Sequence, residues 1–227
     1  MVVPDSPRSS PTHLSKQYYT LLSVTTRSVF RQRQHQAARA LVAEAALPLF
    51  LARGYAGTTT KAIAEAAGAS EGTIFNHFGS KSAVLLAALR QLVPSADDVE
   101  QARQAMDALP DGAAVITEFC RHDAAVAESA LPLVRVFVEA AATDAEVASW
   151  WRDQEEFRHR SQGGLIELLD SHGWLRTDVS KEVLARRLWI TGSPELRIKW
   201  EDAALPPADF GAWEEAVLQG LLLPPRA

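Results

Sequence analysis

Residues 54–85 read GYAGTTTKAIAEAAGASEGTIFNHFGSKSAVL, and this stretch divides into short helices separated by a turn. Thr59 can cap the N-terminus of a first short helix, because its hydroxyl can accept a hydrogen bond from a backbone N–H that has no partner within the helix. Gly68 ends that helix, and a glycine can take the positive φ that a sharp turn needs. Ser70 caps a second short helix, EGTIFNHF, which Gly79 ends. The pattern predicts a helix-turn-helix within this stretch.

A longer helix precedes this stretch and a further one follows it. The first runs from about Gln36 to Gly54, and Pro48 interrupts it at a cost of about 3 kcal/mol unless a kink accommodates the ring. The second begins after Ser80 and continues to about residue 93, where Pro94 ends it. The apolar residues of the first helix recur at the spacing of one buried face: Leu41, Val42, Ala45, Ala46, Leu49 and Phe50.

The remaining residues predict further helices and no convincing strand. Loop signals such as Pro110-Asp111-Gly112 and Leu205-Pro206-Pro207 separate segments whose apolar residues recur at helical spacing. The expected helices cover residues 96–109, 113–129, 133–142, 144–172, 181–190, 194–201 and 208–223. Whether Gly163-Gly164 interrupts the fourth of these is left open.

We therefore expect an all-α protein with three parts. Residues 1–35 are rich in Pro and Ser at their start, and their apolar residues do not recur at a sustained regular spacing. This predicts a mobile basic N-terminal arm, with an extra helix as the alternative. Residues 36–82 form a small three-helix domain that contains the helix-turn-helix, called the head below. Residues 83–227 form a larger helical domain, called the body.

Composition excludes several classes of protein. The chain has 227 residues, of which 47% are apolar and 22% charged, so it is neither collagen-like nor wholly disordered, and it has no membrane-spanning run. Its single cysteine cannot form an internal disulfide or a thiolate zinc site, which indicates a reducing, cytoplasmic location.

The two parts of the chain differ in charge. Residues 1–93 carry ten basic and four acidic groups, a net charge of +6. Residues 94–227 carry 13 basic and 24 acidic groups, a net charge of −11. The overall charge of −5 therefore hides a basic N-terminal part, and such an asymmetry favours a polyanionic partner for that part.

The second short helix presents residues suited to reading DNA. Its polar residues can face outward, where one helix fits the major groove, while Ile74, Phe75 and Phe78 are expected to pack back onto the first helix of the head. Lys81 and the backbone amide of Ser80 lie at a helix N-terminus, which is a natural site for phosphate.

In order and spacing, residues 39–85 resemble the N-terminal domain of the TetR family of bacterial transcriptional repressors. The resemblance rests on Gly-Tyr at 54–55, the paired threonines at 59–60, Ile-Ala at 63–64, Ala-Gly at 67–68, Ser-x-Gly-Thr at 70–73, aromatic-x-His-Phe at 75–78, and Lys81. It implies a homodimer that binds a palindromic double-stranded DNA operator as a repressor and needs no cofactor or metal.

The resemblance also implies a DNA-contacting set of residues in the head. Phe75 stands where the family usually has a tyrosine, so a hydroxyl contact to phosphate is missing there. The arm before the first helix is also longer than the family usually shows. The set is Thr59, Thr60, Lys61, Ser70, Glu71, Gly72, Thr73, Phe75, Asn76, His77 and Lys81.

A further implication is a small apolar effector bound among the helices of the body. All six tryptophans lie in the second half of the chain, where core packing and dimer contacts are the alternative roles for such large side chains. The candidate effector-binding residues are Phe119, His122, Phe137, Trp150, Trp151, Phe157 and Trp189.

Two other functions remain open from the residues alone. A small helical hydrolase or metal-carboxylate oxidase would use His122, His159 and nearby acids, although successive residues such as Cys120, Arg121 and His122 point about 100° apart on a helix. Glu156 and His159 have the spacing of a di-iron ligand pair, but no second copy of that motif occurs. The remaining alternative is an interaction module that has lost DNA binding.

Overall fold

The computed structural model describes the backbone of residues 13–225 and the side chains of residues 32–225. Over that range the chain is all helical, with no strand, and its ten helices are α1 (His13–Gly57), α2 (Thr60–Ala66), α3 (Glu71–Phe78), α4 (Lys81–Leu89), α5 (Ala96–Asp107), α6 (Gly112–Ala141), α7 (Ala145–Ser171), α8 (Lys181–Thr191), α9 (Pro194–Asp202) and α10 (Pro207–Leu222). The all-α prediction is confirmed.

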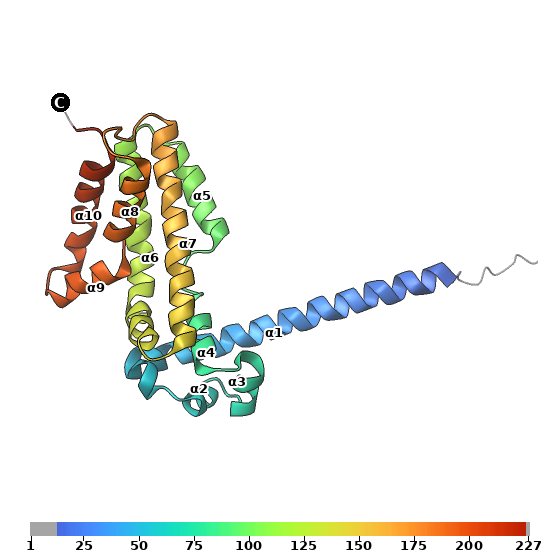
Figure 1. Cartoon of the computed structure of the whole chain (residues 1–227). Coiled ribbons are helices and arrows are strands. Elements are labelled where there is room, and N and C mark those ends of the chain that lie inside the picture. The colour runs from blue at the N-terminus through green and yellow to red at the C-terminus, as the bar shows by residue number, and fades with distance from the viewer. Residues whose placement is uncertain (1–12, 226–227) are drawn as a thin grey trace, which may run out of the picture.

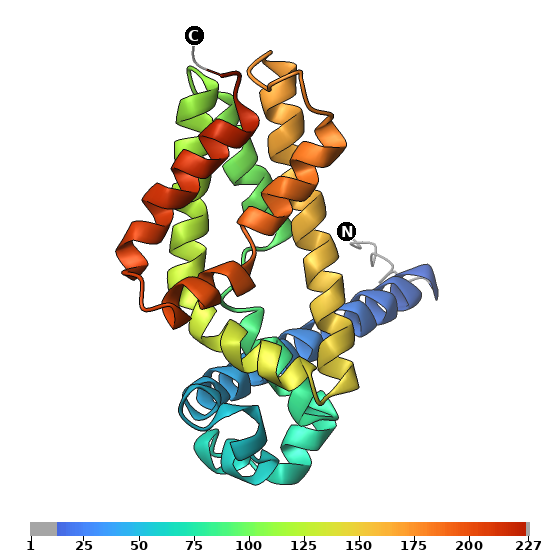
Figure 2. The same cartoon turned by 60° about the vertical axis from the view of Figure 1, so that its left-hand side comes forward.

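The helices form two layers of different orientation. Helix α1 runs across one end of the molecule, with α2 and α3 on its outer side (Figure 1). The long helices α6 and α7 stand side by side on the other side of α1, with α5 against one of their faces and α8 and α10 against the other (Figures 1 and 2). The helix-turn-helix therefore lies at the end of the molecule farthest from α8 and α10.

Helix α1 begins earlier than the sequence predicts. It starts at His13 rather than near Gln36, so the part of the expected arm that is described continues this helix. At its other end Gly54 has φ 66°, which breaks the helical geometry, as the sequence predicts. Residues 1–12 of the arm, and the side chains of the arm's basic residues before Arg33, lie outside the described residues.

Pro48, which was expected to interrupt its helix, and Pro132 both lie within continuous helices. Pro48 is inside α1, and Pro132 is inside α6, where the sequence predicts two separate helices. Both prolines are exposed. A proline has no N–H to donate to the carbonyl four residues earlier, which belongs to Glu44 for Pro48 and to Glu128 for Pro132. Both glutamates are exposed as well. Water can hydrate those carbonyls, and the packing of the rest of each helix offsets the remaining cost.

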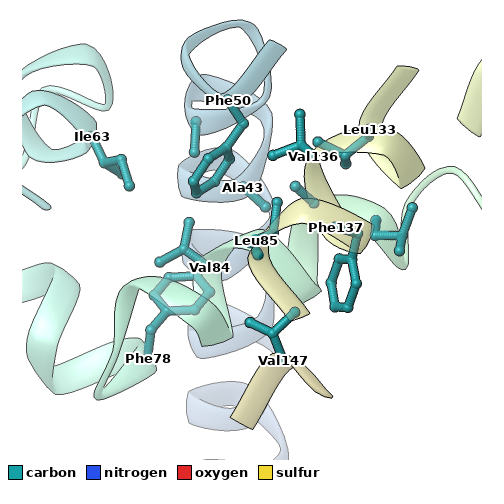
Figure 3. Packing of buried hydrophobic residues seen from close by; sticks show 14 of the residues in the cluster. Ala43, Phe50, Ile63, Phe78, Val84, Leu85, Leu133, Val136, Phe137 and Val147 are labelled. Atoms are coloured by element: carbon teal, nitrogen blue, oxygen red, sulfur yellow. The ribbon is translucent and has the colours of Figure 1, made fainter. Parts of the chain in front are cut away.

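A hydrophobic core joins the head to the near ends of α6 and α7. Phe50 of α1, Leu85 of α4 and Phe137 of α6 are fully buried, and Figure 3 shows residues of these three helices packed together with Val147 of α7. A second cluster fills the far end of the body between α6, α7, α8 and α10. One expected core residue is wrong: Leu41 is 66% exposed, because Ala43 takes its place in the buried stripe of α1.

Within residues 13–225, none of the described helices combines the length and the apolar character needed to cross a bilayer.

Candidate DNA-binding surface and effector cavity

The turn between α2 and α3 has the geometry that the sequence predicts. Gly68 has φ 62°, in the left-handed region that favours glycine. The amide of Gly68 donates to the carbonyl of Glu65 at 3.2 Å, and the amide of Ala69 donates to the carbonyl of Ala64 at 2.9 Å, which closes the end of α2. The chain thus reverses within four residues and starts α3 at a fixed angle to α2.

Three hydroxyl caps fix where the helices of the head begin. The Thr59 hydroxyl accepts from the amide of Ala62 at 3.1 Å, and the Ser70 hydroxyl accepts from the amide of Thr73 at 3.1 Å. Ser80 caps α4 in the same way, and each cap residue has an extended backbone. These caps confirm the predicted starts of α2, α3 and α4.

The outer face of α3 is made of exposed residues. Glu71, Gly72, Phe75 and Asn76 are exposed, while Ile74 and Phe78 are buried against α1. Phe75 was expected to pack inward, and this prediction is wrong because its side chain is 70% exposed. Ile74 and Phe78, four residues apart, already fill the inner face of so short a helix, and Phe75 lies about 100° away from Ile74.

The remaining residues of the predicted DNA-contacting set lie at the start of α2, on or just before α3, and at the start of α4. Thr59, Lys61 and Ser70 are exposed, and Thr60, Thr73, His77 and Lys81 are half-buried. The Thr60 hydroxyl donates to the Glu71 carboxylate at 3.3 Å, so the first turns of α2 and α3 are joined. Glu71 also lies in the first turn of α3, where a negative charge complements the helix dipole.

His77, near the C-terminal end of α3, also contacts residues of α1. Its ring packs against the ring of His35 in a tilted arrangement, with 4.4 Å between centroids, and Arg39 donates a hydrogen bond to its backbone carbonyl. Arg39 also lies over the ring of Phe78 at 4.2 Å. The C-terminal end of α3 is therefore held by two residues of α1, of which His35 precedes the predicted start of that helix.

The ammonium group of Lys81 has a structural role within the protein. Lys81 Nζ donates to the carbonyl of Tyr55 at 2.7 Å and lies 4.0 Å from the centre of the Tyr55 ring. Partial burial lowers the pKa of Lys81, and the nearby charge of Asp144 opposes that shift. A lysine has three N–H donors, so those not bonded to Tyr55 remain for a phosphate.

A set of hydrogen bonds joins the head to the first turn of α7. The Tyr55 hydroxyl donates to Asp144 Oδ2 at 2.6 Å, and Asp144 caps α7 by accepting from the amides of Glu146 and Val147. Beside it, Ser80 donates to Glu146 Oε2 at 2.9 Å, and Ser82 donates to the same oxygen. We call these five side chains, Tyr55, Ser80, Ser82, Asp144 and Glu146, the junction.

The body contains a cavity of about 260 Å³ between α4, α5, α6, α7 and α9. Its walls are mainly apolar and include Leu89, Val99, Met106, Val134 and Leu165. Five of the seven predicted effector-binding residues line it: Phe119, His122, Trp150, Trp151 and Phe157.

The other two predicted residues lie beside the cavity rather than on its wall. Phe137 is fully buried and packs against Trp150, with the ring centroids 4.7 Å apart. Trp189 contacts the edge of His159 at 6.0 Å between centroids, and Arg158 lies 5.4 Å from the centre of its indole. Neither side chain reaches the space that a ligand in this cavity would fill.

Two charged residues that the sequence did not point to, Asp123 and Arg197, also line the cavity, and a third, Glu214, pairs with Arg197. Arg197 of α9 donates to Asp123 of α6 at 2.6 Å and to Glu214 of α10 at 2.8 Å. Glu214 is fully buried, and this burial together with the charge of Asp123 raises its pKa to about 8, against the opposing effect of Arg197. Because these residues are far apart in the sequence and on three helices, their spacing gave no signal.

The residues of the two alternative enzymatic readings do not come together. Cys120 is buried and lies among apolar side chains, and burial raises the pKa of its thiol. Glu156 and His159 are exposed, whereas His122 lines the cavity. Among the residues whose side chains are described, no three histidine, cysteine or acidic side chains are placed to hold a metal ion.

Residues 42–88 match the family model of bacterial regulatory proteins of the tetR family. The match covers residues 42–57 of α1 and all of α2 and α3, and it ends one residue before the end of α4. No curated protein matches the chain.

Solved structures share the fold over most of their length. A protein from Mesorhizobium loti assigned to the TetR family is 20% identical, with a TM-score of 0.64 over 82% of this chain and 96% of that one. NalD of Pseudomonas aeruginosa, the secondary repressor of the MexAB-OprM multidrug efflux pump, is 17% identical, with a TM-score of 0.67 over 83% and 98%. The transcriptional regulator FadR of Bacillus subtilis, solved with stearoyl-CoA, is 15% identical, with a TM-score of 0.63 over 80% and 96%.

Proposed function

Because this chain belongs to the TetR family of DNA-binding transcriptional regulators, we propose that it is a repressor that binds a palindromic operator as a homodimer and leaves it when a small molecule enters the body. Proteins of this family are regulators rather than enzymes. In this proposal residues 36–82 are the DNA-binding domain, and residues 83–227 are the effector-binding and dimerisation domain. It acts in the cytoplasm, where its operator is.

The exposed outer face of α3 is the observation that carries the DNA-binding part of the proposal. Gly72 lets the backbone approach the bases closely, and Asn76 can donate and accept at a base edge. Phe75 offers an apolar ring to a thymine methyl group. Thr59, Lys61 and Ser70 flank α3, where they would contact phosphates and fix the register of the helix in the groove.

Exposed faces of α8 and α10 support the dimer. Helix α8 exposes Val183 and Ile190, the latter by 59%. Helix α10 exposes Ala212, Ala216 and Gly220, which are spaced by four residues and so share one face. Pairing these two helices with their copies would bury both faces in an isologous interface, with the two heads at the far end of each protomer.

Helix α7 offers a route from the cavity to the head. Asp144 and Glu146 of the junction precede Trp150 and Trp151 of the cavity wall by at most two helical turns. A molecule that fits only a displaced position of α7 would move the junction and with it the head. DNA is released by population shift when the displaced form binds the molecule better than the DNA-bound form does.

A gel shift with the DNA upstream of the gene tests the proposal. We expect a retarded band at low salt, and we expect the affinity to fall steeply as salt rises, because each phosphate contact displaces a counterion. Absence of any retarded band at low salt, with protein shown to be folded by circular dichroism, would rule out the proposed function for that DNA and its regulated gene.

A further inference from the structure

The first part of α1, residues 13–35, extends beyond the rest of the molecule, and we call it the extension. In Figures 1 and 2 no other helix runs beside most of it, and it leaves the head on the side away from α8 and α10. The family model matches from residue 42 onward, so the extension precedes the part of the chain that this model describes. If α8 and α10 pair with their copies, the extension points away from the other protomer.

The extension and the turns that follow it are basic. No aspartate or glutamate occurs between Asp5 and Glu44, whereas this part of the chain carries several cations. An uncompensated run of positive charge favours a polyanionic partner, and duplex DNA presents one phosphate per about 1.7 Å of its axis. The cations of residues 13–43 are Lys16, Arg27, Arg31, Arg33 and Arg39.

Three of these cations lie along one side of α1. Arg27 and Arg31 precede His35 by eight and four residues, and each step of four residues turns an α-helix by only about 40° beyond a full turn. Lys16 precedes Arg27 by eleven residues, which is three turns to within about 20°. The Cα atoms of Lys16, Arg27 and Arg31 therefore form a row about 22 Å long, roughly the length of six base pairs. We call these three residues the basic stripe.

Contacts with α3 fix the direction in which this side of α1 faces. The ring of His35 packs against the ring of His77 of α3, and Arg39, one turn later, donates to the carbonyl of His77. Arg31 lies one turn before His35, so the basic stripe starts on the side of α1 that touches α3. Because α3 lies on the outer side of α1 (Figure 1), the stripe begins on the same side of the molecule as the DNA-reading helix.

The cations near the DNA-binding surface are also free of carboxylates. Among the side chains described between residues 32 and 94, no arginine or lysine forms an ion pair, whereas eight in the body do. A cation without a carboxylate partner can bind a phosphate without first breaking an ion pair. The unpaired cations are Arg33, Arg39, Arg53, Lys61, Lys81 and Arg90.

From these observations we infer that the basic stripe binds the phosphate backbone of duplex DNA outside the half-site that α3 reads. The inference rests on the proposed function, because it extends the DNA contact of the same head. His35 and Arg39 are positioning residues, since they hold α1 against α3 and so aim the stripe at the flanking DNA. Phosphate contacts carry no base information, so the length of the flanks and the salt concentration should matter, and the sequence of the flanks should not.

Duplexes of two lengths test this inference. Both carry the inverted repeat that the full-length protein enriches from random duplex DNA. The short duplex ends at the outer edge of each half-site, and the long one continues on each side for about 12 base pairs of arbitrary sequence, which exceeds the length of the stripe. We expect the unchanged protein to bind the long duplex about tenfold more tightly at low salt. The slope of its log affinity against log salt should be steeper by about 0.9 for each extra phosphate contact.

A triple variant assigns this preference to the stripe. Lys16→Gln/Arg27→Gln/Arg31→Gln removes three charges and keeps good helix formers at all three positions. It should bind the long duplex no more tightly than the short one, and its affinity for the short duplex should stay close to that of the unchanged protein. Circular dichroism checks that its helical content is unchanged.

The matched control removes the same number of charges from the body. Arg152→Gln/Arg160→Gln/Lys199→Gln changes three exposed cations of α7 and α9. Its net charge equals that of the stripe variant, so a general effect of charge on DNA binding would appear in both. We expect the control to keep the tenfold preference for the long duplex.

A tethered cleavage reagent locates the stripe on the DNA. The native Cys120 is buried, so an iron-EDTA reagent that reacts with thiols should label only an introduced cysteine. On the long duplex, labelled Arg27→Cys should cut the DNA outside the half-sites. Labelled Arg160→Cys, which places the reagent in the body, should leave the duplex uncut.

Several results would overturn the inference. They are equal affinities of the unchanged protein for the two duplexes, a preference that survives in the stripe variant, an equal loss in the control, and cutting by labelled Arg27→Cys inside the half-sites or nowhere. A protein that binds both duplexes equally loses only this inference, whereas one that binds no DNA loses the proposed function as well.

An anionic membrane is the other surface that a basic helix can bind. The unchanged protein and both triple variants are therefore also sedimented with phosphatidylglycerol vesicles. Sedimentation that depends on the stripe, together with equal affinities for the two duplexes, would assign the stripe to lipid and overturn the inference.

Discussion

The hydroxyl of Tyr55 lies 2.6 Å from Oδ2 of Asp144 and joins the C-terminal end of α1 to the N-cap of α7. This hydrogen bond lowers the pKa of Asp144, and burial together with the same bond raises the pKa of Tyr55. Because Asp144 also caps α7, the position of the head is coupled to the start of the helix that carries Trp150 and Trp151.

A double-mutant cycle measures this coupling. Tyr55→Phe removes the donor, and Asp144→Asn keeps an N-cap while weakening the acceptor. We expect a coupling free energy of about 1–2 kcal/mol from urea unfolding, as for a hydrogen bond to a charged group that is partly exposed. The control cycle pairs Tyr55→Phe with Asp111→Asn, the cap of α6, and should give less than about 0.5 kcal/mol. Equal values in the two cycles would contradict a specific link between the head and α7.

Two glycines of the helix-turn-helix should respond to alanine in opposite ways. Gly68→Ala forces an alanine to φ 62° with no atom within 4 Å to gain a contact, so we expect a loss of about 1–2 kcal/mol in unfolding free energy. Gly72→Ala lies within α3, where its Cβ would be 3.7 Å from the Ser70 hydroxyl, so we expect no loss of stability. Its methyl group should instead weaken DNA binding. A Gly72→Ala protein with unchanged DNA affinity would show that the backbone does not approach the bases there.

A charge on the exposed face of α8 should break the dimer. Ile190→Glu places a carboxylate where an apolar side chain would be buried in the proposed interface, so we expect light scattering to give the mass of one chain, 24.7 kDa, instead of about twice that mass. Leu41→Glu is the control, because Leu41 is exposed to a similar degree but lies on α1. A dimer that persists in Ile190→Glu, or one that is lost in Leu41→Glu, would place the interface elsewhere.

The buried carboxyl of Glu214 predicts a pH dependence of stability. Its pKa is raised to about 8, well above the ordinary value of an unfolded chain, about 4.3. Between these values the folded state holds a proton that the unfolded state has released, so the stability that this proton provides is complete below about pH 4 and is lost as pH rises through about 8.

Denaturant unfolding between pH 5 and pH 8 checks this dependence. We expect the free energy of unfolding to fall more steeply with pH in the unchanged protein than in Glu214→Gln, which keeps an acceptor for Arg197 and cannot titrate. Other groups that titrate in this range, histidines included, are common to both proteins and cancel in the difference. Parallel curves would mean that Glu214 is ionised throughout this range.

The features that the sequence predicts well depend on contacts a few residues apart. The caps Thr59, Ser70 and Ser80 each bind an amide three residues later, and Gly68 turns the chain through its own φ. The outward position of Phe75 could also have been predicted from the sequence, because the spacing of Ile74 and Phe78 already defines the inner face of α3.

The features that sequence reasoning missed depend on the surroundings of a residue in the fold. Pro48 and Pro132 remain within helices at exposed positions, where the residues whose carbonyls they leave without a donor, Glu44 and Glu128, are exposed as well. The cluster of Asp123, Arg197 and Glu214 comes from three helices, and the Tyr55–Asp144 bond spans 89 residues. No local pattern predicts such pairs, since packing of whole helices brings them together.

Sequence-specific DNA binding by α3 is tested most directly by in vitro selection from a pool of random duplex DNA. We expect the full-length protein to enrich one inverted repeat, with half-sites centred about one helical turn apart, roughly 10 base pairs. The matched control is the double variant Phe75→Ala/Asn76→Ala. Both side chains are exposed, so this variant should keep its melting temperature and its dimer while losing the enrichment. Enrichment of no sequence by the unchanged protein, or of the same repeat to the same degree by the variant, would contradict the assignment of α3 as the DNA-reading helix.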